Sequence, residues 1–141
     1  MLVATPLTII PLILFNILAL TVGTDVWTGT VFGLTMLSGA RWVLSVGDLM
    51  IILGIGMLFA ELMKSARASS STILNHILST VVLIVYIIEF IVVGVAANSI
   101  FFILTVIALF DVVLGFSISI RTATRDISMV PPMIDGAHGG G

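Results

Sequence analysis

The sequence predicts an all-α membrane protein: a bundle of four transmembrane helices, with a short extracytoplasmic β-hairpin between the first and second helices. Two observations lead to this prediction. The 141 residues are 60% hydrophobic and 9% charged, with a mean hydropathy of +1.35, which lies far outside the usual composition of soluble domains. In addition, apolar segments long enough to cross a bilayer recur along the chain.

The first predicted helix covers about residues 7–23. No Lys or Arg precedes it, as one would in a secretory signal, so we interpret it as a retained helix. Pro11 interrupts this run and predicts a kink, because a proline inside a helix leaves one carbonyl without its partner. The alternative is that Pro11 ends a short interfacial turn that begins at Pro6.

The other three helices are expected at about 49–67, 72–97 and 100–120, so that 1–125 form one transmembrane domain. Asp48 directly precedes the second apolar run, where a helix N-cap belongs. We expect its side chain to accept hydrogen bonds from the free N–H groups of the first turn, at the membrane surface.

Residues 24–47 form a connection that is too long for a simple helix hairpin and too apolar for a disordered loop. Val31–Leu37 and Ala40–Val46 have the composition of strands, and they flank Ser38-Gly39. The pattern predicts a β-hairpin at 31–46 with a two-residue turn.

The two tryptophans, Trp27 and Trp42, are expected to be interface anchors, because amphipathic rings concentrate at the headgroup level. The hairpin would then lie over the outer mouth of the bundle. A re-entrant or surface helix is the alternative, since short apolar runs discriminate poorly between helix and strand.

Each of the last three apolar segments contains a carboxylate: Glu61, Glu89 and Asp111. An ionisable group at the centre of a membrane helix costs roughly 2.5–3.5 kcal/mol, so these acids are candidate intramembrane polar or proton sites. Lys64 follows Glu61 by three residues and is expected to pair with it. Asp111 lies near the middle of its span, and we expect it to be neutral or bonded to a polar group on a neighbouring helix.

Polar side chains share one face of the third span. At about 100° per residue, Asn75, Ser79, Tyr86 and Glu89 fall near a common direction, which adds Asn75 and Tyr86 to the candidate sites. Two further faces combine small and polar residues: Ala108, Asp111, Gly115 and Ser119 on the fourth span, and Gly54, Glu61 and Ser65 on the second. Such faces either hold a bundle together or line a polar path.

No catalytic residue, cofactor site or metal site is predicted. The chain has no cysteine and no motif for nucleotide or metal binding, and its few basic residues are too scattered for nucleic acid. Ser69, Ser70 and Ser71 have no plausible base beyond His76, which is too little for an intramembrane hydrolase. We interpret His76 as an interfacial histidine, with a metal or proton role as the alternative. We therefore do not expect an enzyme.

The positive residues predict the orientation. Four of the five Lys and Arg residues fall on one side of the predicted membrane: Lys64, Arg67, Arg121 and Arg125. By the positive-inside rule this side and both termini are cytoplasmic, with Arg41 alone in opposition. The tail at 126–141 is expected to be short and flexible.

Several segments resemble a known group of proteins: SGARW at 38–42, GDLM at 47–50, Asn75 to Phe90, and FFILTVIALFDVVLGFSISIRTATRD at 101–126. Together they resemble an uncharacterised family of small four-span bacterial inner-membrane proteins, and the resemblance covers most of the chain. It implies a bacterial cytoplasmic (inner) membrane and a shared scaffold in which an acid like Asp111 recurs. It implies no activity, ligand or catalytic residue.

Two functions follow as hypotheses. The first is a non-catalytic integral membrane subunit, in contact with the lipid bilayer, which forms a homo-oligomer or is accessory to other membrane subunits. The second is an oligomeric proton or cation conduit that uses buried carboxylates such as Glu89 and Asp111. We favour the first, because a four-span bundle of 141 residues has little room for an internal path.

The predicted orientation is tested by single cysteines, since the chain has none of its own. An impermeant thiol reagent outside the cell should label Thr28→Cys and Asn98→Cys but not Ala68→Cys or Ser128→Cys, because only the first pair lies outside. Labelling of the second pair without the first would show that the orientation is reversed.

Overall fold

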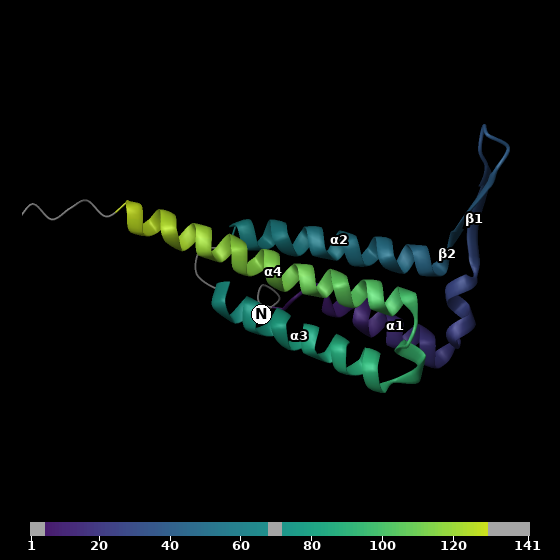
Figure 1. Cartoon of the computed structure of the whole chain (residues 1–141), viewed down its shortest axis with the longest axis horizontal. Coiled ribbons are helices and arrows are strands. Elements are labelled where there is room, and N and C mark those ends of the chain that lie inside the picture. Colours follow the sequence, from purple (N-terminus) through teal and green to yellow (C-terminus); the bar gives the residue numbers. More distant parts are fainter. Residues whose placement is uncertain (1–4, 68–71, 130–141) are drawn as a thin grey trace, which may run out of the picture.

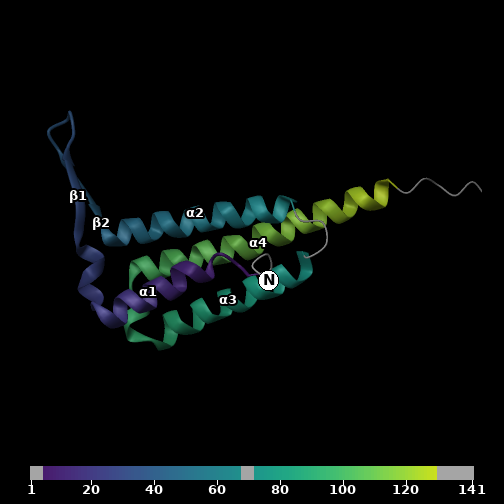
Figure 2. The same cartoon turned by 180° about the vertical axis from the view of Figure 1, so that it is seen from behind.

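A computed structural model describes residues 5–67 and 72–129. Four helices run alongside one another and a β-hairpin extends from one end (Figures 1 and 2). The elements in chain order are α1 (Ile9–Thr21), the 3-10 helix η1 (Thr24–Thr28), β1 (Thr30–Thr35), β2 (Arg41–Ser45), α2 (Val46–Arg67), α3 (Thr72–Val92), the 3-10 helix η2 (Gly94–Ala96) and α4 (Ser99–Ser128). The predicted arrangement of helices and hairpin is confirmed at this level.

Three of the described helices, α2, α3 and α4, are long and apolar enough to cross a membrane. Helix α1 has 13 residues, so at ~1.5 Å per residue it measures about 20 Å, against ~30 Å for a hydrocarbon core. It begins and ends two residues inside the predicted bounds of 7–23. The first element is therefore an apolar helix too short to cross alone.

Each end of α1 has a residue with a special backbone: Pro11 near its start and Gly23 just after its end. Pro11 is the third helical residue, in the first turn, where a missing N–H breaks no helical hydrogen bond. The reason for expecting a kink there is thereby removed. After Thr21 the chain turns at Gly23, whose φ of +97° is rarely accessible to residues with a side chain.

Helix α2 begins three residues before the predicted start at 49, because Ser45 and Asp48 form a reciprocal cap. The Asp48 carboxylate accepts from the Ser45 backbone N–H at 2.8 Å and from its hydroxyl at 2.7 Å. The Ser45 hydroxyl oxygen in turn accepts from the Asp48 backbone N–H at 3.1 Å. The prediction of Asp48 as N-cap is wrong by one turn: Ser45 precedes the helix and Asp48 reaches back to it.

The hairpin forms where it is predicted, but with a three-residue loop, Leu37 to Gly39. The Met36 N–H donates to the Ala40 carbonyl at 2.8 Å, and the Gly39 N–H donates to the Met36 carbonyl at 2.9 Å. Gly39 has a φ of +82°, while no other residue of the described loop has a positive φ. A two-residue turn at Ser38-Gly39 is therefore wrong, because its usual form requires positive φ at both residues.

The hairpin does not lie over the mouth of the bundle. It extends beyond the outer side of α2 and across the direction of the helices (Figures 1 and 2). Trp42 lies on this hairpin and is half-exposed. Trp27, in contrast, is a buried residue of η1 and stacks on Phe15 with ring centroids 4.5 Å apart. Its ring therefore packs inside the protein, and its depth at the headgroup level stays a prediction.

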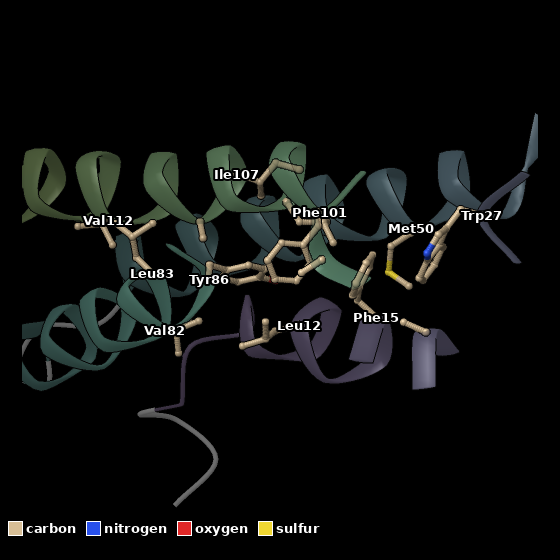
Figure 3. Packing of buried hydrophobic residues seen from close by; sticks show 14 residues of the cluster. Leu12, Phe15, Trp27, Met50, Val82, Leu83, Tyr86, Phe101, Ile107 and Val112 are labelled. Carbon is tan, nitrogen blue, oxygen red and sulfur yellow. The ribbon is translucent and has the colours of Figure 1, made fainter. Parts of the chain in front are cut away.

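The half of the bundle nearer the hairpin has an aromatic core (Figure 3). The Phe101 ring packs edge-on against Phe15 with centroids 4.7 Å apart, and Tyr86 lies 5.4 Å from Phe101. Met50 of α2 fills the space beside Trp27 in the same cluster. This interior brings together side chains from every helix.

The last two helices differ from their predicted bounds at one end each. Helix α3 ends at Val92, and η2 replaces the end of the predicted helix at 72–97. Helix α4 continues eight residues beyond the predicted end at 120. The tail predicted at 126–141 therefore begins inside α4, and its residues from 130 onward lie outside the described residues.

Two glycines of α2 provide a test of this packing. A side chain at Gly54 would overlap Leu104 and Ile107 of α4, whereas a Cβ at Gly56 would meet nothing within 4 Å beyond its own helix. We expect Gly54→Val to lower the free energy of unfolding by about 1–3 kcal/mol through overpacking. Gly56→Val should be neutral or stabilising. Unfolding by SDS in mixed micelles measures both, and equal effects would contradict the packing of α2 on α4.

Candidate functional site

A buried polar network joins the start of the chain to α2, α3 and α4. It surrounds residues 5–8, which we call the N-terminal segment; these residues precede α1 and are not helical. Thr8, Glu61 and Asp111 are only 2%, 1% and 3% exposed. Groups as polar as these are buried only where hydrogen bonds compensate the loss of water.

Glu61 is the most connected residue of the network. Its carboxylate accepts from the Leu7 backbone N–H at 3.0 Å and from the Asn75 side-chain amide at 2.6 Å. Its expected ion pair with Lys64 is present, at 2.9 Å. The Lys64 ammonium also donates to the Thr5 carbonyl at 2.9 Å. One carboxylate of α2 thus holds the N-terminal segment and α3 together.

Asp111 of α4 likewise bonds both to the N-terminal segment and to α3. Its carboxyl accepts from the Thr8 hydroxyl at 3.1 Å, and the Ser79 side chain of α3 also bonds to it. The Tyr86 hydroxyl donates to the Thr8 carbonyl at 3.0 Å. Asp111 is therefore bonded to polar groups of neighbouring segments, which is one of the two states expected for it.

The network supplies side-chain partners to the backbone of the N-terminal segment. A buried N–H or C=O without a partner costs about as much as a lost hydrogen bond, roughly 1–3 kcal/mol. The Leu7 N–H precedes α1 and donates to Glu61. The Tyr86 hydroxyl donates to the Thr8 carbonyl, in addition to the helical bond that an N-cap carbonyl accepts, and Lys64 donates to the exposed Thr5 carbonyl. Glu61 therefore takes the place of a helical partner for the Leu7 N–H, and Tyr86 and Lys64 add further bonds to the segment.

The predicted polar stripe of α3 divides into two parts. Asn75, Ser79 and Tyr86 are buried within the network, whereas Glu89 is half-buried one turn beyond Tyr86 and is not bonded to it. Among the described residues, three buried side-chain atoms have no hydrogen-bond partner: Trp27 Nε1, Asn75 Oδ1 and Glu89 Oε1. Glu89 is the one candidate acid whose environment the network does not explain.

His76 is buried against α4, and its predicted depth near the membrane interface stays a prediction. Its ring bonds to the Ser119 hydroxyl and stacks on Phe116, with centroids 5.1 Å apart. A side chain at Gly115 would overlap this ring. The small residues on α4 thus make room for the imidazole. The described part of the chain contains no group of three side chains suited to a metal ion.

The sequence pattern alone does not point to Thr8 or to the backbone of Leu7. Thr8 stands at the N-cap position of α1 but makes no side-chain cap bond, and its hydroxyl donates to Asp111 instead. The available signal was a hydroxyl residue between Pro6 and Pro11, which marks a place where the backbone needs external partners. Its partner lies 103 residues away, so no local pattern could have identified it.

An open groove of about 490 Å³ lies at the other end of the bundle, around the turn from α3 to α4. Phe90 and Phe102 line it together with Asn98. The Asn98 side chain is already engaged: its amide nitrogen donates to the Val95 carbonyl at 2.8 Å, and its oxygen accepts from the Phe101 N–H at 3.0 Å. The groove is therefore an apolar surface, separate from the polar network.

No family model, curated protein or solved structure matches the chain. The resemblance to small bacterial inner-membrane proteins therefore rests on the sequence segments alone. Function has to be inferred from the polar network and from the exposed surfaces.

Two threonines provide a matched test of the network. Thr8→Val keeps the shape of the side chain but removes the donor to Asp111, which should lower the free energy of unfolding by about 1–3 kcal/mol. Thr21→Val is the control, because the exposed Thr21 hydroxyl bonds to Ile17 within its own helix. Unfolding in mixed micelles measures both. Equal losses would show that the Thr8 bond contributes nothing specific.

Proposed function

We propose that this chain is a non-catalytic integral subunit of a bacterial cytoplasmic membrane, which self-assembles or is accessory to a larger membrane complex. The observation that carries the proposal is that the acids of the polar network find their hydrogen-bond partners within the chain itself. Glu61 and Asp111 are bonded to the chain's own N-terminal segment and to α3. A structural task therefore accounts for the two most buried acids.

The interior on the hairpin side of the network supports a structural role. Beyond Tyr86 the described core consists of Phe15, Phe101 and Trp27 with aliphatic neighbours. A relay through one copy would need further polar groups or water along that direction. The described core there is mainly aromatic and aliphatic, and Trp27 Nε1 and Glu89 Oε1 beyond Tyr86 have no hydrogen-bond partner that would continue such a relay.

The network supports our proposal of a fourth crossing, which would begin with a helix too short to span a bilayer alone. Non-helical backbone is tolerated at membrane depth only where protein groups satisfy it. The N-terminal segment has such partners, so in our proposal it completes the crossing that α1 begins. Both termini then lie in the cytoplasm, on the side of Lys64, Arg67, Arg121 and Arg125.

The outer faces of the helices suit lipid and other membrane subunits. Large aliphatic and aromatic side chains remain exposed along them, including Ile52, Ile55 and Phe59 on α2 and Ile84 and Ile88 on α3. In water such a surface would aggregate, whereas in a bilayer it is the normal contact with acyl chains. The proposed partners are therefore the lipid bilayer and further copies or other subunits.

An oligomeric proton or cation conduit is the second candidate, and Glu89 is the observation in its favour. One buried oxygen of this carboxyl has no partner, and Glu89 lies one turn from Tyr86. Tyr86 connects through Thr8 to Asp111. Between copies, Glu89 would extend this chain of polar groups.

Asp111→Asn separates the two functions in liposomes. Asparagine still accepts the Thr8 hydroxyl but cannot carry a proton, so assembly should change by no more than the ~0.6–2 kcal/mol typical of interhelical hydrogen bonds. For a structural subunit we expect no proton or cation flux from the parent protein. Thr105→Val, whose hydroxyl bonds within its own helix, is the control on α4.

The opposite result would support the conduit. It would consist of a flux in the parent protein, driven by a pH gradient or an imposed potential, that Asp111→Asn abolishes and Thr105→Val preserves. Retained assembly in both variants would show that the loss is not a folding defect.

A further inference from the structure

The β-hairpin has one apolar face that the described chain leaves largely uncovered. Phe32 pairs with Leu44, and Leu34 pairs with Trp42. Since alternate residues of a strand point to the same side, these four side chains share one face, which we call the aromatic face. The Phe32 and Trp42 rings are indeed in contact, with centroids 6.4 Å apart.

The opposite face of the hairpin has less bulky side chains and carries the one charge of the two strands. It is formed by the pairs Gly33 with Val43 and Thr35 with Arg41. Arg41 is the single basic residue of the two strands and is exposed near the turn. The hairpin is therefore amphipathic across its thickness. At its tip, Leu37 is fully exposed.

The junction with α2 determines where this hairpin lies. Strand β2 ends at Ser45 and α2 begins at Val46, with no linker between them. The reciprocal bonds between Ser45 and Asp48 hold the junction. Figures 1 and 2 show the hairpin running past the outer side of α2, across the helix direction. A segment in that direction stays near one depth of the membrane instead of leaving it.

We propose that the hairpin lies in the headgroup region of the outer leaflet beside α2, with its aromatic face among the upper acyl chains. Its partner is phospholipid. This proposal rests on the membrane function proposed above. Amphipathic segments at the interface bury their apolar face by roughly 5–10 Å, and Trp is enriched at that depth.

Continuity along the chain favours lipid over a second copy as the occupant. Strand β2 leads without a linker into α2, whose exposed Ile52, Ile55 and Phe59 are among the side chains that we propose to contact acyl chains. Charge agrees with this placement: Arg41, on the polar face, is at headgroup height, where phosphates carry negative charge. The free backbone groups of both strand edges remain hydrated there.

Tryptophan fluorescence in vesicles tests the proposal on the full chain, because the chain has only two tryptophans. In Trp27→Phe the emission comes from Trp42 alone. We expect phosphatidylcholine brominated at shallow acyl positions to quench it more than lipid brominated near the chain ends, and aqueous iodide to quench it weakly. Since Trp27 is buried, the difference between the parent protein and Trp42→Phe gives the same signal without altering the core.

Two substitutions of an aliphatic residue by serine distinguish the two faces of the hairpin. Leu34→Ser lies on the aromatic face and should reduce quenching by brominated lipid and increase quenching by iodide. Val43→Ser lies on the opposite face and should leave both unchanged. Equal effects of the two substitutions would overturn the proposed orientation.

Three other results would overturn the proposal. Trp42 that iodide quenches and brominated lipid does not would place the hairpin in water. Protection of Trp42 that increases with the protein-to-lipid ratio would show that a second copy covers it. If the chain is washed from vesicles by alkaline carbonate, the membrane function fails as well, whereas retained protein with a water-exposed Trp42 contradicts the hairpin proposal alone.

Discussion

The structure depends on one constraint: residues 6–8 pack into the bundle ahead of α1 without being helical. Polar groups in such a place need partners, because a buried unpaired group costs roughly 1–3 kcal/mol. Glu61 supplies the partner for the Leu7 N–H, Asp111 supplies the partner for the Thr8 hydroxyl, and Tyr86 donates to the Thr8 carbonyl. Glu61 and Asp111 would be unfavourable in a membrane helix on their own, but here they are the hydrogen-bond partners that allow the N-terminal segment to pack into the bundle.

The interior of the bundle consequently differs in composition between its two halves. One half contains the polar network, and the half nearer the hairpin contains stacked aromatic rings. Close helix contact supports both, since Gly54 admits Leu104 and Gly115 admits the His76 ring. This division explains how one small chain can contain several buried acids and still have an apolar interior, and it underlies the structural role that we propose.

Local sequence patterns predicted the helices and the hairpin, but they did not predict the cap of α2 or the hydrogen bonds between distant segments. Hydropathy and strand composition located the helices and the hairpin, because these depend on residues close in sequence. Asp48 was misplaced by one turn, since either Ser45 or Asp48 suits a cap and only the structure shows both acting together. Periodicity placed Asn75 and Tyr86 on one face, but the bond between Thr8 and Asp111 spans 103 residues and depends on tertiary packing. The contacts of His76 could not be predicted from its own helix, because the ring packs on Phe116 and beside Gly115 of α4.

Hydrogen exchange of the Leu7 amide, followed by NMR in nanodiscs, tests the central claim most directly. This N–H precedes α1 and donates to the Glu61 carboxylate at 3.0 Å. The account predicts slow exchange in the parent protein and much faster exchange in Glu61→Ala, while amides in the middle of α3 and α4 stay protected. Fast exchange of the Leu7 amide in the parent protein would contradict it, because the N-terminal segment would then not be held by the buried carboxylate.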